Sequence, residues 1–312
     1  MKEGAIQVVL GNPRGFCAGV VRAIDVVELC LQRLGPPIYV RHEIVHNPHV
    51  VEELRQKGAI FVNEIDDVPP GETVVFSAHG VAPSVRAEAM AKGLRIIDAS
   101  CPLVTKVHLE ALKYAREGYT IILVGHRSHD EVIGTMGEAP DQTVLIETPE
   151  EAAQVRVPNP NRVVALTQTT LSVDDTREII RVLKQRFPAL VTRNDICYAT
   201  TNRQAAAKAM AAEVDTVLVI GAENSSNCNR LRETAEAAGR RAYLINGPEN
   251  INPRWFDGVK KVGVTSGAST PERLVTAVVE ALRPHTVSTI SVAEENVSFA
   301  LPKELQEDTP PG

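Results

Sequence analysis

The chain has 312 residues, of which 44% are hydrophobic and 23% charged, and its formal net charge is −6. This composition is that of a globular protein and excludes disordered and fibrous classes. No apolar run approaches the roughly 18 residues of a membrane span, and the first residues leave no room for a signal peptide, so we expect a cytoplasmic protein. Because the chain is acidic and has no block of consecutive Lys or Arg, nucleic acids and anionic membranes are not expected partners.

The apolar pattern alternates between the periods of strands and helices, which is typical of parallel α/β units. The predicted strands cover residues 6–11, 38–40, 59–62, 73–77, 94–97, 120–124, 143–146, 162–167, 190–192, 215–220, 242–245 and 261–265. The predicted helices cover about 18–34, 48–57, 83–92, 102–117, 149–155, 173–187, 200–212, 227–239 and 271–282. A polar loop is expected after residue 124, and the tail beyond Pro284 has no clear pattern, with a frayed end at 308–312.

Three of the strand-turn-helix segments carry a cysteine at the turn, and the turns recur at intervals close to a third of the chain. They hold Cys17, Cys101 and Cys197. A chain of this length exceeds one hydrophobic core, so we expect an α/β fold of three pseudo-symmetric units whose thiols converge on one centre. The expected units are 1–97, with the tail 284–312 packed on it, then 98–193 and 194–283.

The thiols are expected to be metal ligands or catalytic groups. The chain has five cysteines, an odd number, and no secretory signal is expected, which argues against a disulfide framework. At a helix N-terminus the helix dipole should lower a thiol pKa and favour the thiolate. Cys30 lies on the apolar side of a helix and is expected in the core, whereas Cys228 lies outside the three-turn pattern and is a weaker candidate for a fourth ligand. Three thiolates fit an iron–sulfur cluster with one open iron. Zinc with three Cys and a His or water is the alternative, and the lack of a close Cys-x-x-Cys pair favours the cluster.

Histidines and a carboxylate stand in loops after predicted strands. His46, His79 and His129 come from separate loops, and the carboxyl ends of parallel strands face a common ligand crevice. Any one of them alone could equally be a turn histidine bonded to backbone. Glu131 is a candidate proton donor if burial raises its pKa, although a helix-capping role is the alternative. Thr169 ends another strand and adds a hydroxyl to the same rim.

Two further loops suit a phosphate ligand that is held without a positive side chain. Each follows an apolar strand and opens a helix, and together they offer Ser225, Ser226, Asn227 and Ser269. Backbone N–H groups, hydroxyls and an amide can surround phosphate oxygens, although a helix cap uses the same geometry. Neither loop has the P-loop pattern, and no Gly-x-Gly-x-x-Gly follows a strand, which disfavours nucleotide binding.

Taken in order along the chain, seven motifs resemble the 4-hydroxy-3-methylbut-2-enyl diphosphate reductase family, the last enzyme of the methylerythritol phosphate route to isoprenoids. The motifs are Asn12-Pro-Arg-Gly-Phe-Cys-Ala-Gly19, Val40-Arg-His-Glu-Ile-Val-His-Asn47, Phe76-Ser-Ala-His-Gly80, Ala99-Ser-Cys-Pro-Leu-Val-Thr-Lys106, Thr167-Gln-Thr-Thr-Leu-Ser172, Asp195-Ile-Cys-Tyr-Ala-Thr-Thr-Asn-Arg203 and Asn224-Ser-Ser-Asn227. The resemblance extends from about residue 7 to Leu305.

The resemblance implies a trefoil of three α/β units around a [4Fe–4S] cluster held by Cys17, Cys101 and Cys197, with the fourth iron open to the substrate's hydroxymethyl oxygen. It implies that Glu131 delivers protons and that Thr169 orients the substrate alcohol or a water. The implied diphosphate ligands are His46, His79, His129, Ser225, Ser226, Asn227 and Ser269. The implied reaction uses two electrons and two protons, releases water and yields isopentenyl and dimethylallyl diphosphates, with ferredoxin or flavodoxin as the electron donor.

The sequence departs from the family at Asp130, where the family often has Pro, and the extra carboxylate could shift the pKa of His129 or Glu131. Two other functions remain open at this point. A non-redox hydro-lyase would use the open iron only to polarise a hydroxyl, and an iron–sulfur sensor would bind a diphosphate without turnover.

Overall fold

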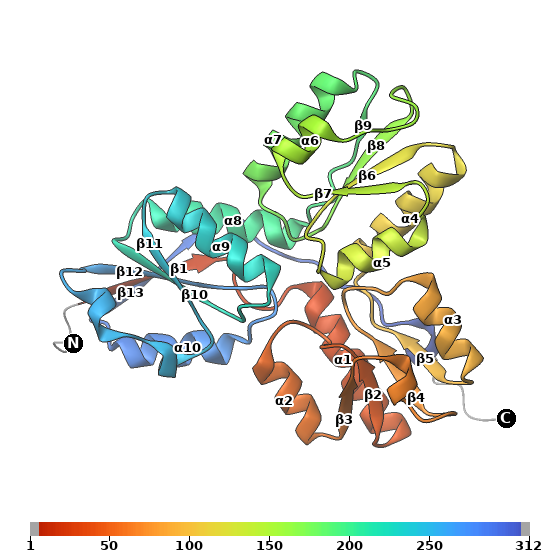
Figure 1. Cartoon of the computed structure of the whole chain (residues 1–312). Helices are drawn as coiled ribbons and strands as arrows, with labels where there is room; N and C mark the ends of the chain where they lie inside the picture. Colours follow the sequence, from red (N-terminus) through yellow and green to blue (C-terminus); the bar gives the residue numbers. More distant parts are fainter. Residues whose placement is uncertain (1–5, 307–312) are drawn as a thin grey trace.

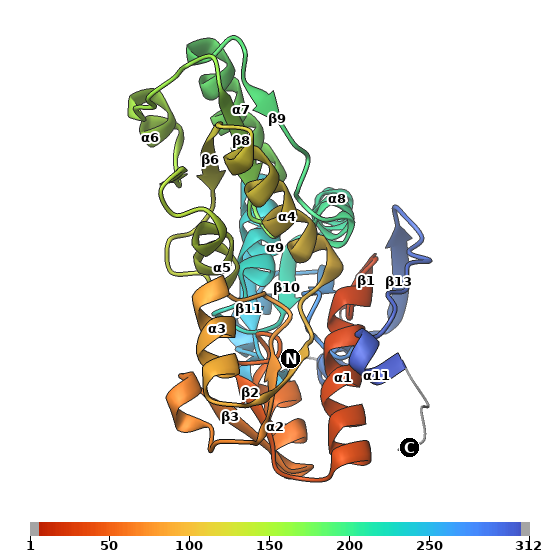
Figure 2. The same cartoon turned by 90° about the vertical axis from the view of Figure 1, so that its right-hand side faces the viewer.

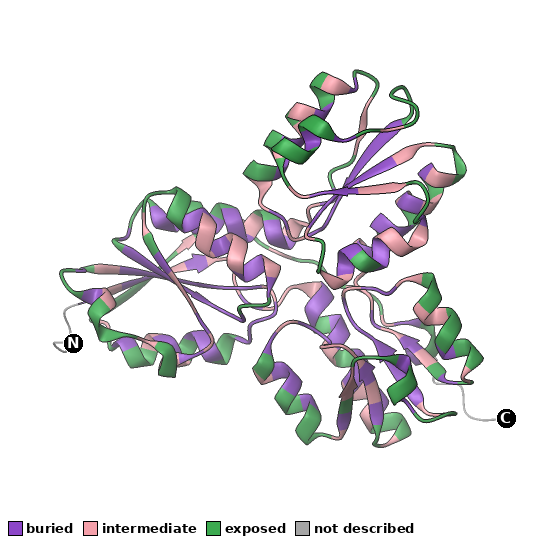
Figure 3. Cartoon of the chain, in the orientation of Figure 1, coloured by how far each residue is buried: buried purple, intermediate pink, exposed green. Residues whose placement is uncertain are grey.

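The computed structural model describes residues 6–306, which form three α/β lobes that meet at one centre (Figure 1). Each lobe is built on a parallel sheet whose central strands are buried, while the covering helices expose their outer faces (Figure 3). The expected trefoil of three α/β units is confirmed. Among the described helices, none is long and apolar enough to cross a lipid bilayer.

The first lobe has a four-stranded sheet in the order β3-β2-β4-β5. Its strands are β2 (Ile38–Arg41), β3 (Ala59–Val62), β4 (Thr73–Phe76) and β5 (Arg95–Asp98). Its helices are α1 (Ala18–Leu34), α2 (Pro48–Gln56), the short 3-10 helix η1 (Ile65–Asp67) and α3 (Pro83–Ala91). Helix α1 buries Val26 and Val27 against Ile38 and Val40 of the sheet, which is the apolar stripe that its sequence predicts.

The second lobe repeats this design with the strand order β7-β6-β8-β9. Its strands are β6 (Thr120–Val124), β7 (Thr143–Ile146), β8 (Val163–Thr167) and β9 (Val191–Thr192). Its helices are α4 (Pro102–Arg116), α5 (Asp130–Glu138), α6 (Pro149–Gln154) and α7 (Val173–Arg186). Val107 and Ala111 of α4 pack on Ile121 and Leu123 of the sheet.

The third lobe has a five-stranded sheet in the order β11-β10-β12-β1-β13, and it takes strands from both ends of the chain. Its strands are β10 (Thr216–Ile220), β11 (Arg241–Ile245), β12 (Lys261–Ser266), β1 (Gln7–Asn12) and β13 (Thr286–Ser291). Its helices are α8 (Tyr198–Ala211), α9 (Ser226–Ala237), η2 (Pro248–Asn250), η3 (Pro253–Phe256) and α10 (Glu272–Leu282), and the tail ends in α11 (Lys303–Gln306).

One connection rule is common to the three lobes. In each lobe one strand leads to a cysteine and then to a helix: β5 in the first lobe, β9 in the second and β1 in the third. These strands pair with β4, β8 and β12, respectively. That helix packs on the next lobe: α1 on the first, α4 on the second and α8 on the third. The three cysteines therefore lie where the chain crosses from one lobe to another. The starts of helices α1, α4 and α8, which follow them, gather near the centre of the molecule (Figures 1 and 2).

Two segments differ from the sequence prediction. The expected polar loop after residue 124 contains α5, whose pattern is obscured by Gly134 and Gly137. These glycines allow close packing, since a Cβ on Gly134 would lie 3.2 Å from the His108 ring. The tail forms β13, whose mostly exposed side chains show no apolar alternation because β13 is an edge strand held by backbone pairing with β1.

At the two ends of the chain, the boundaries between the lobes differ from the boundaries expected for the three units. Strand β1 was assigned to unit 1–97, but it pairs with β12 in the third lobe, because that sheet lacks a fourth strand of its own. The tail 284–312 was expected on the first unit. The end of the tail follows this prediction, since Leu301 and Leu305 pack in the first lobe. Its beginning does not, because β13 joins the sheet of the third lobe. Residues 307–312, including the predicted frayed end, lie outside the described residues.

We expect the tail to stabilise the first lobe through Leu305, whose side chain is 2% exposed in that lobe's core. Leu305→Ala should lower the free energy of unfolding by about 2–4 kcal/mol, because it removes buried methyl groups and leaves a cavity. The measurement is denaturant unfolding of the purified protein. Val297→Ala, at a tail position that is 43% exposed, is the control and should change stability by less than about 0.5 kcal/mol. Equal effects of the two changes would contradict the docking of the tail.

Candidate functional site

A cavity of about 110 Å³ lies where the three lobes meet, and all the residues predicted for the site line it. They are Cys17, Cys101, Cys197, His46, His79, His129, Glu131, Thr169, Ser225, Ser226, Asn227 and Ser269. The lining contains no Lys or Arg among the described residues. An anionic ligand would therefore be held here by neutral donors and helix N-termini.

The three cysteines occupy equivalent positions. Each is the N-cap residue of its helix, α1, α4 or α8. The sequence predicts a cysteine at each of these turns, but α8 begins at Tyr198 and not at the expected residue 200. Each also donates its backbone N–H to a carbonyl two residues beyond the neighbouring strand: Cys17 to Ala268 at 3.2 Å, Cys101 to Ala78 at 2.9 Å and Cys197 to Thr169 at 3.0 Å. This repeated hydrogen bond fixes each turn to the sheet it leaves and aims the thiols at the common cavity.

Gly19 leaves room for the thiols on one side of the cavity. A Cβ at this position would lie 2.7 Å from Sγ of Cys101 and 3.8 Å from Sγ of Cys17. Any side chain at residue 19 would therefore displace Cys101. The sequence signal was present in the Cys-Ala-Gly motif, but the need for glycine arises from a thiol 82 residues away and is visible only in the fold.

The expectation that a helix N-terminus lowers the thiol pKa is wrong for Cys101 and Cys197 in the protein without a metal. Burial raises the pKa of Cys101 to about 12 and that of Cys197 to about 11, and this outweighs backbone hydrogen bonds from the helix N-termini. The other thiolates add repulsion. A thiolate in this cavity therefore requires a cation beside it, and iron or zinc would supply that charge.

The donor set fits a cluster better than a single ion. Ligands of one tetrahedral zinc lie within about 4 Å of one another. In the described part of the chain the group of ligand atoms that all lie within 4.8 Å is His46, His79 and Asp130, and the three thiols do not form such a group. Cys30 and Cys228 do not line the cavity; both are fully buried in hydrophobic clusters. Three converging thiols with no fourth cysteine would hold a polynuclear cluster and leave one metal position open.

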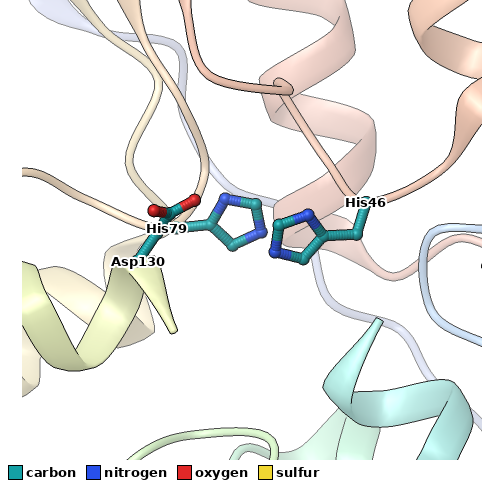
Figure 4. Close-up of side chains that lie close together, drawn as sticks. All are labelled: His46, His79 and Asp130. Atoms are coloured by element: carbon teal, nitrogen blue, oxygen red, sulfur yellow. The ribbon is translucent and has the colours of Figure 1, made fainter. Parts of the chain in front are cut away.

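The three histidines form a compact group from three loops. The rings of His46 and His79 are stacked with centroids 4.1 Å apart, and His129 meets them edge-on at 5.5 and 5.7 Å. In Figure 4 the two stacked rings each turn a nitrogen toward the other, and the carboxylate of Asp130 lies on the far side of His79. A ligand oxygen could accept hydrogen bonds from several imidazoles at this point.

Neighbouring groups determine which ring nitrogens remain available. The Nδ1 atom of His129 accepts the backbone N–H of Glu131 at 3.2 Å, so a neutral His129 carries its proton on Nε2. Nδ1 of His46 lies 3.1 Å from the carboxylate of Glu43, which the sequence analysis did not select. Burial holds the pKa of His129 at about 4 and that of His79 well below its usual value, with mutual repulsion among the rings as the next cause. These two imidazoles are neutral hydrogen-bond donors at pH 7.

Asp130 joins the first two lobes at the edge of the histidine group. Its Oδ1 atom lies 2.9 Å from Nδ1 of His42, whose backbone has the left-handed φ of 57°. Burial alone would raise the pKa of Asp130, but the His42 hydrogen bond and the nearby imidazoles hold it at about 2. The Asp130 carboxylate raises the pKa values of His79 and His129, which offsets part of the lowering caused by burial. It is not among the causes of the shift at Glu131.

Glu131 is a buried carboxyl group fixed by Thr169. One oxygen accepts the Thr169 backbone N–H at 2.6 Å, and the other accepts the Thr169 hydroxyl at 3.0 Å. Burial raises the pKa of Glu131 to about 7, and the two hydrogen bonds reduce the shift only in part. A carboxyl group with this pKa can hold and release a proton near neutral pH.

The loop that contains Ser225, Ser226 and Asn227 has buried polar atoms without a hydrogen-bond partner. Ser225 caps α9, and Ser226 donates its hydroxyl to the Thr170 carbonyl at 3.1 Å. Gln168, which sequence reasoning did not select, donates to Ser226 at 3.3 Å. Both side-chain polar atoms of Asn227 are buried without a hydrogen-bond partner. A buried amide without a partner costs free energy, so a polar ligand in the cavity would satisfy a need that the chain leaves open.

We expect Glu131 to make stability depend on pH. In the unfolded chain the carboxyl ionises from about pH 4.5, whereas the folded protein keeps it protonated to about pH 7. Glu131 therefore destabilises the fold progressively as pH rises between these values. Glu131→Gln removes this effect, so its melting temperature minus that of the wild type should increase from about pH 5 to about pH 8. A difference that is constant with pH would contradict the raised pKa.

Comparison with known proteins places this geometry in a family. Residues 8–283 match the LytB protein family. The 4-hydroxy-3-methylbut-2-enyl diphosphate reductase of Ralstonia nicotianae is 54% identical, covering 96% of this chain and 94% of that protein. The enzyme of the same name from Mycolicibacterium gilvum is 55% identical, with 96% and 92% covered.

A solved structure agrees with these relatives. The E-1-hydroxy-2-methyl-but-2-enyl-4-diphosphate reductase from Plasmodium falciparum superposes with a TM-score of 0.94 at 42% identity, covering 97% of each chain. A further structure titled as the (E)-4-hydroxy-3-methyl-but-2-enyl diphosphate reductase has a TM-score of 0.63 at 34% identity. Because the match extends over nearly the whole sequence and the whole fold, the chain belongs to the LytB protein family.

Proposed function

We propose that the protein is an oxidoreductase that removes the hydroxyl group of 4-hydroxy-3-methylbut-2-enyl diphosphate and forms isopentenyl and dimethylallyl diphosphates. The observation that carries the proposal is the content of one cavity: three converging thiols, a carboxyl group with a pKa of about 7, and neutral phosphate-type donors. A reductive dehydroxylation needs all three, and the relatives bear this enzyme's name.

Cys17, Cys101 and Cys197 would hold a [4Fe–4S] cluster with one iron free of protein ligands. The convergence of the thiols, the space at Gly19 and the exclusion of Cys228 from the cavity support this cluster. When bound, the cluster would supply electrons and a Lewis-acidic position at the substrate hydroxyl. The chain's own part is to bury the thiols and to leave one side of the site open toward Glu131 and Thr169.

The diphosphate would lie among the histidines, Ser225, Ser226, Asn227 and Ser269. Neutral imidazoles and hydroxyls can donate several hydrogen bonds to the phosphate oxygens, and the N-terminus of α9 adds the positive end of its dipole. The orphaned amide of Asn227 supports a ligand at this end of the cavity. Binding here would exclude water from the site and fix the allylic alcohol toward the thiols.

Glu131 would be the proton donor. The overall change breaks the C–O bond and forms a C–H bond, and it consumes two electrons and two protons with the hydroxyl leaving as water. The carboxyl of Glu131 can hold one proton at neutral pH. The Thr169 hydroxyl donates a hydrogen bond to this carboxyl, which holds the two groups side by side. Thr169 would thus orient the substrate alcohol or the departing water.

Delivery of electrons by ferredoxin or flavodoxin and a cytoplasmic location remain predictions. The hydro-lyase and sensor alternatives differ from the proposed reaction in electron use. A hydro-lyase forms product without a reductant, and a sensor binds the diphosphate without forming product. Oxidation of a reduced dye on adding substrate separates the reductase from both alternatives, and analysis of the product formed without a reductant separates the hydro-lyase from the sensor.

We expect anaerobically purified protein with a full complement of iron and sulfide to oxidise reduced methyl viologen when 4-hydroxy-3-methylbut-2-enyl diphosphate is added. Cys101→Ser should lose iron and electron consumption together, because the cluster would lose one of its three thiolates. Cys30→Ser, at a buried cysteine that does not line the cavity, is the matched control and should retain both. A protein with a full cluster that consumes no electrons would refute the reductase function.

We expect Glu131→Gln to reduce the rate of the viologen-coupled reaction by on the order of 10²–10⁴, the usual contribution of a positioned acid. The affinity for the substrate and the iron content should stay close to those of the wild type. The Gln oxygen can still accept the Thr169 backbone N–H, and the Gln NH₂ group can donate to the Thr169 hydroxyl in place of accepting from it. The measurements are single-turnover kinetics and calorimetric titration with substrate. An unchanged rate would remove Glu131 from the mechanism.

A further inference from the structure

Three basic side chains recur at equivalent positions in the helices that follow the three cysteines. They are Arg22 in α1, Lys106 in α4 and Arg203 in α8. Arg22 and Lys106 stand five residues after their cysteine and Arg203 stands six residues after its own, which is about one and a half helical turns. The starts of the three helices gather near the centre of the molecule (Figure 1). Each basic side chain therefore belongs to the helix by which the chain enters a lobe.

Each of these side chains contacts the turn by which the chain leaves the same lobe. The contacts are Arg22 Nη1 with the Ser100 carbonyl at 3.0 Å, Lys106 Nζ with the Asp195 carboxylate at 3.4 Å and Arg203 Nη2 with the Gly15 carbonyl at 2.8 Å. In every case the acceptor residue stands one or two positions before the next cysteine. Every lobe thus has one basic side chain that links its entry helix to its exit turn, and these three contacts are here named the clamps.

The clamps link the thiols in pairs. The chain enters the first lobe at Cys17 and leaves it at Cys101, and the second lobe extends in the same way from Cys101 to Cys197. The third lobe begins after Cys197, and its strand β1 leads to Cys17. One clamp in each lobe therefore holds one pair of thiols at a set separation. Together the clamps hold the three sides of the triangle on which three ligands of one cluster must stand.

Two of the clamps are buried and also hold the tail of the chain. Arg203 is 0% exposed, and besides Gly15 it contacts the Glu295 carboxylate at 3.0 Å. Arg22 is 9% exposed and donates to the Ala300 carbonyl at 2.7 Å. Hydrogen bonds from a buried guanidinium are strong and directional, and several of them on one side chain restrict its movement. The tail therefore supports the same two clamps that hold the cysteine turns.

Arg22 is a buried cation whose hydrogen bonds, in the part of the chain that the structure describes, all go to backbone carbonyls. The other two clamps contact carboxylates instead. Burial lowers the pKa of Arg22, and the negative charges of Asp98 and Cys101 act in the opposite direction. A buried charge without an ion pair is costly, so an anionic group beside Cys101 would stabilise this arrangement. A cluster held by thiolates would be such a group, and the charge of Arg22 would act on it in turn.

We propose that Arg22, Lys106 and Arg203 are positioning residues that hold the three thiols at the separations a cluster requires, and that the charge of Arg22 favours the reduced cluster. The inference rests on the cluster of the proposed function. Contacts to the surroundings of metal ligands typically change metal affinity about 10–100-fold. Charge beside an iron–sulfur cluster is one of the factors that set its reduction potential.

The first test follows the loss of iron from anaerobic, cluster-loaded protein to an excess of chelator. Lys106→Met should lose iron on the order of tenfold faster than the wild type, because the exit turn at Asp195 is no longer held. The side chain of Lys106 is 50% exposed, so the fold should tolerate its removal, and a thermal melt checks this. Lys106→Arg keeps the charge and a donor, and should lose iron at the wild-type rate.

Lys113→Met is the matched control, since Lys113 is an exposed lysine seven residues further along the same helix. This variant should lose iron at the wild-type rate. Asp195→Asn removes the other partner of the Lys106 clamp and should also speed the loss. The double variant should lose iron no faster than Lys106→Met, because both changes remove the same contact.

The second test measures the reduction potential of the bound cluster by a redox titration followed by electron paramagnetic resonance. Arg22→Gln removes the charge but keeps a donor for the Ser100 carbonyl, so the potential should become more negative. Arg22→Lys keeps the charge and loses the planar fork, so it should retain the wild-type potential while losing iron faster. A role confined to packing would change both variants alike.

Both readouts require neither substrate nor turnover. Equal rates of iron loss in the wild type and Lys106→Met would refute the positioning role, and equal potentials in the wild type and Arg22→Gln would refute the role of the charge. Failure of the proposed reaction is distinguishable, because it would appear as a wild-type protein that holds a full cluster but consumes no electrons with substrate. A wild-type protein that holds no cluster would refute both the proposed function and this inference.

Discussion

The structure depends on one repeated constraint: each cysteine stands at the point where the chain leaves one sheet and enters a helix of the next lobe. The backbone N–H of each cysteine is tied to the loop beyond the neighbouring strand of the sheet it leaves. The helix that it caps is held by the core of the following lobe. The position of each thiol is therefore fixed by two lobes at once. The three thiols converge only when the three lobes are packed together.

The same arrangement explains the electrostatics of the cavity. Closing three lobes over a small space removes water from the groups inside it. Burial then shifts the pKa values of Cys101, Cys197, His79, His129 and Glu131 toward the neutral forms. Neutral imidazoles and a protonated carboxyl are useful for binding an anion and donating a proton, so for these groups the shift serves the proposed chemistry. For the thiols it is unfavourable without a cation. Among the described residues the cavity lining has no Lys or Arg, so a bound metal would supply the compensating charge.

The lobes are related by approximate threefold repetition, but the two faces around the thiols differ. Toward the cavity, each lobe contributes small or polar groups from loops after its strands, and the histidines and hydroxyls collect on that side. On the outside, the hollow next to Cys101 is lined by Arg22, Lys106, Glu110 and Lys113, whereas the hollow next to Cys17 is lined by Arg14, Arg22, Asp25, Glu294 and Glu295. The repetition thus builds a symmetric centre, and the outer residues of individual helices give each approach to it a different chemical character.

Most strands and helices, the turn position of the three cysteines and twelve of the residues that line the cavity could be predicted from the sequence alone. These are local properties: apolar periodicity, turn residues and short motifs report on their own segment of chain. The membership of β1 and β13 in the third sheet was decided by tertiary structure, because an open sheet edge accepts whichever strand the fold brings to it. Helix α5 was hidden by glycines whose purpose is contact with His108 and Ala82 of other elements. The thiol pKa values were also misjudged, since a helix N-terminus is visible in sequence but the loss of water around a thiol is not. Burial, pairing between distant segments and the need for Gly19 beside Cys101 arise only when remote parts of the chain are packed together.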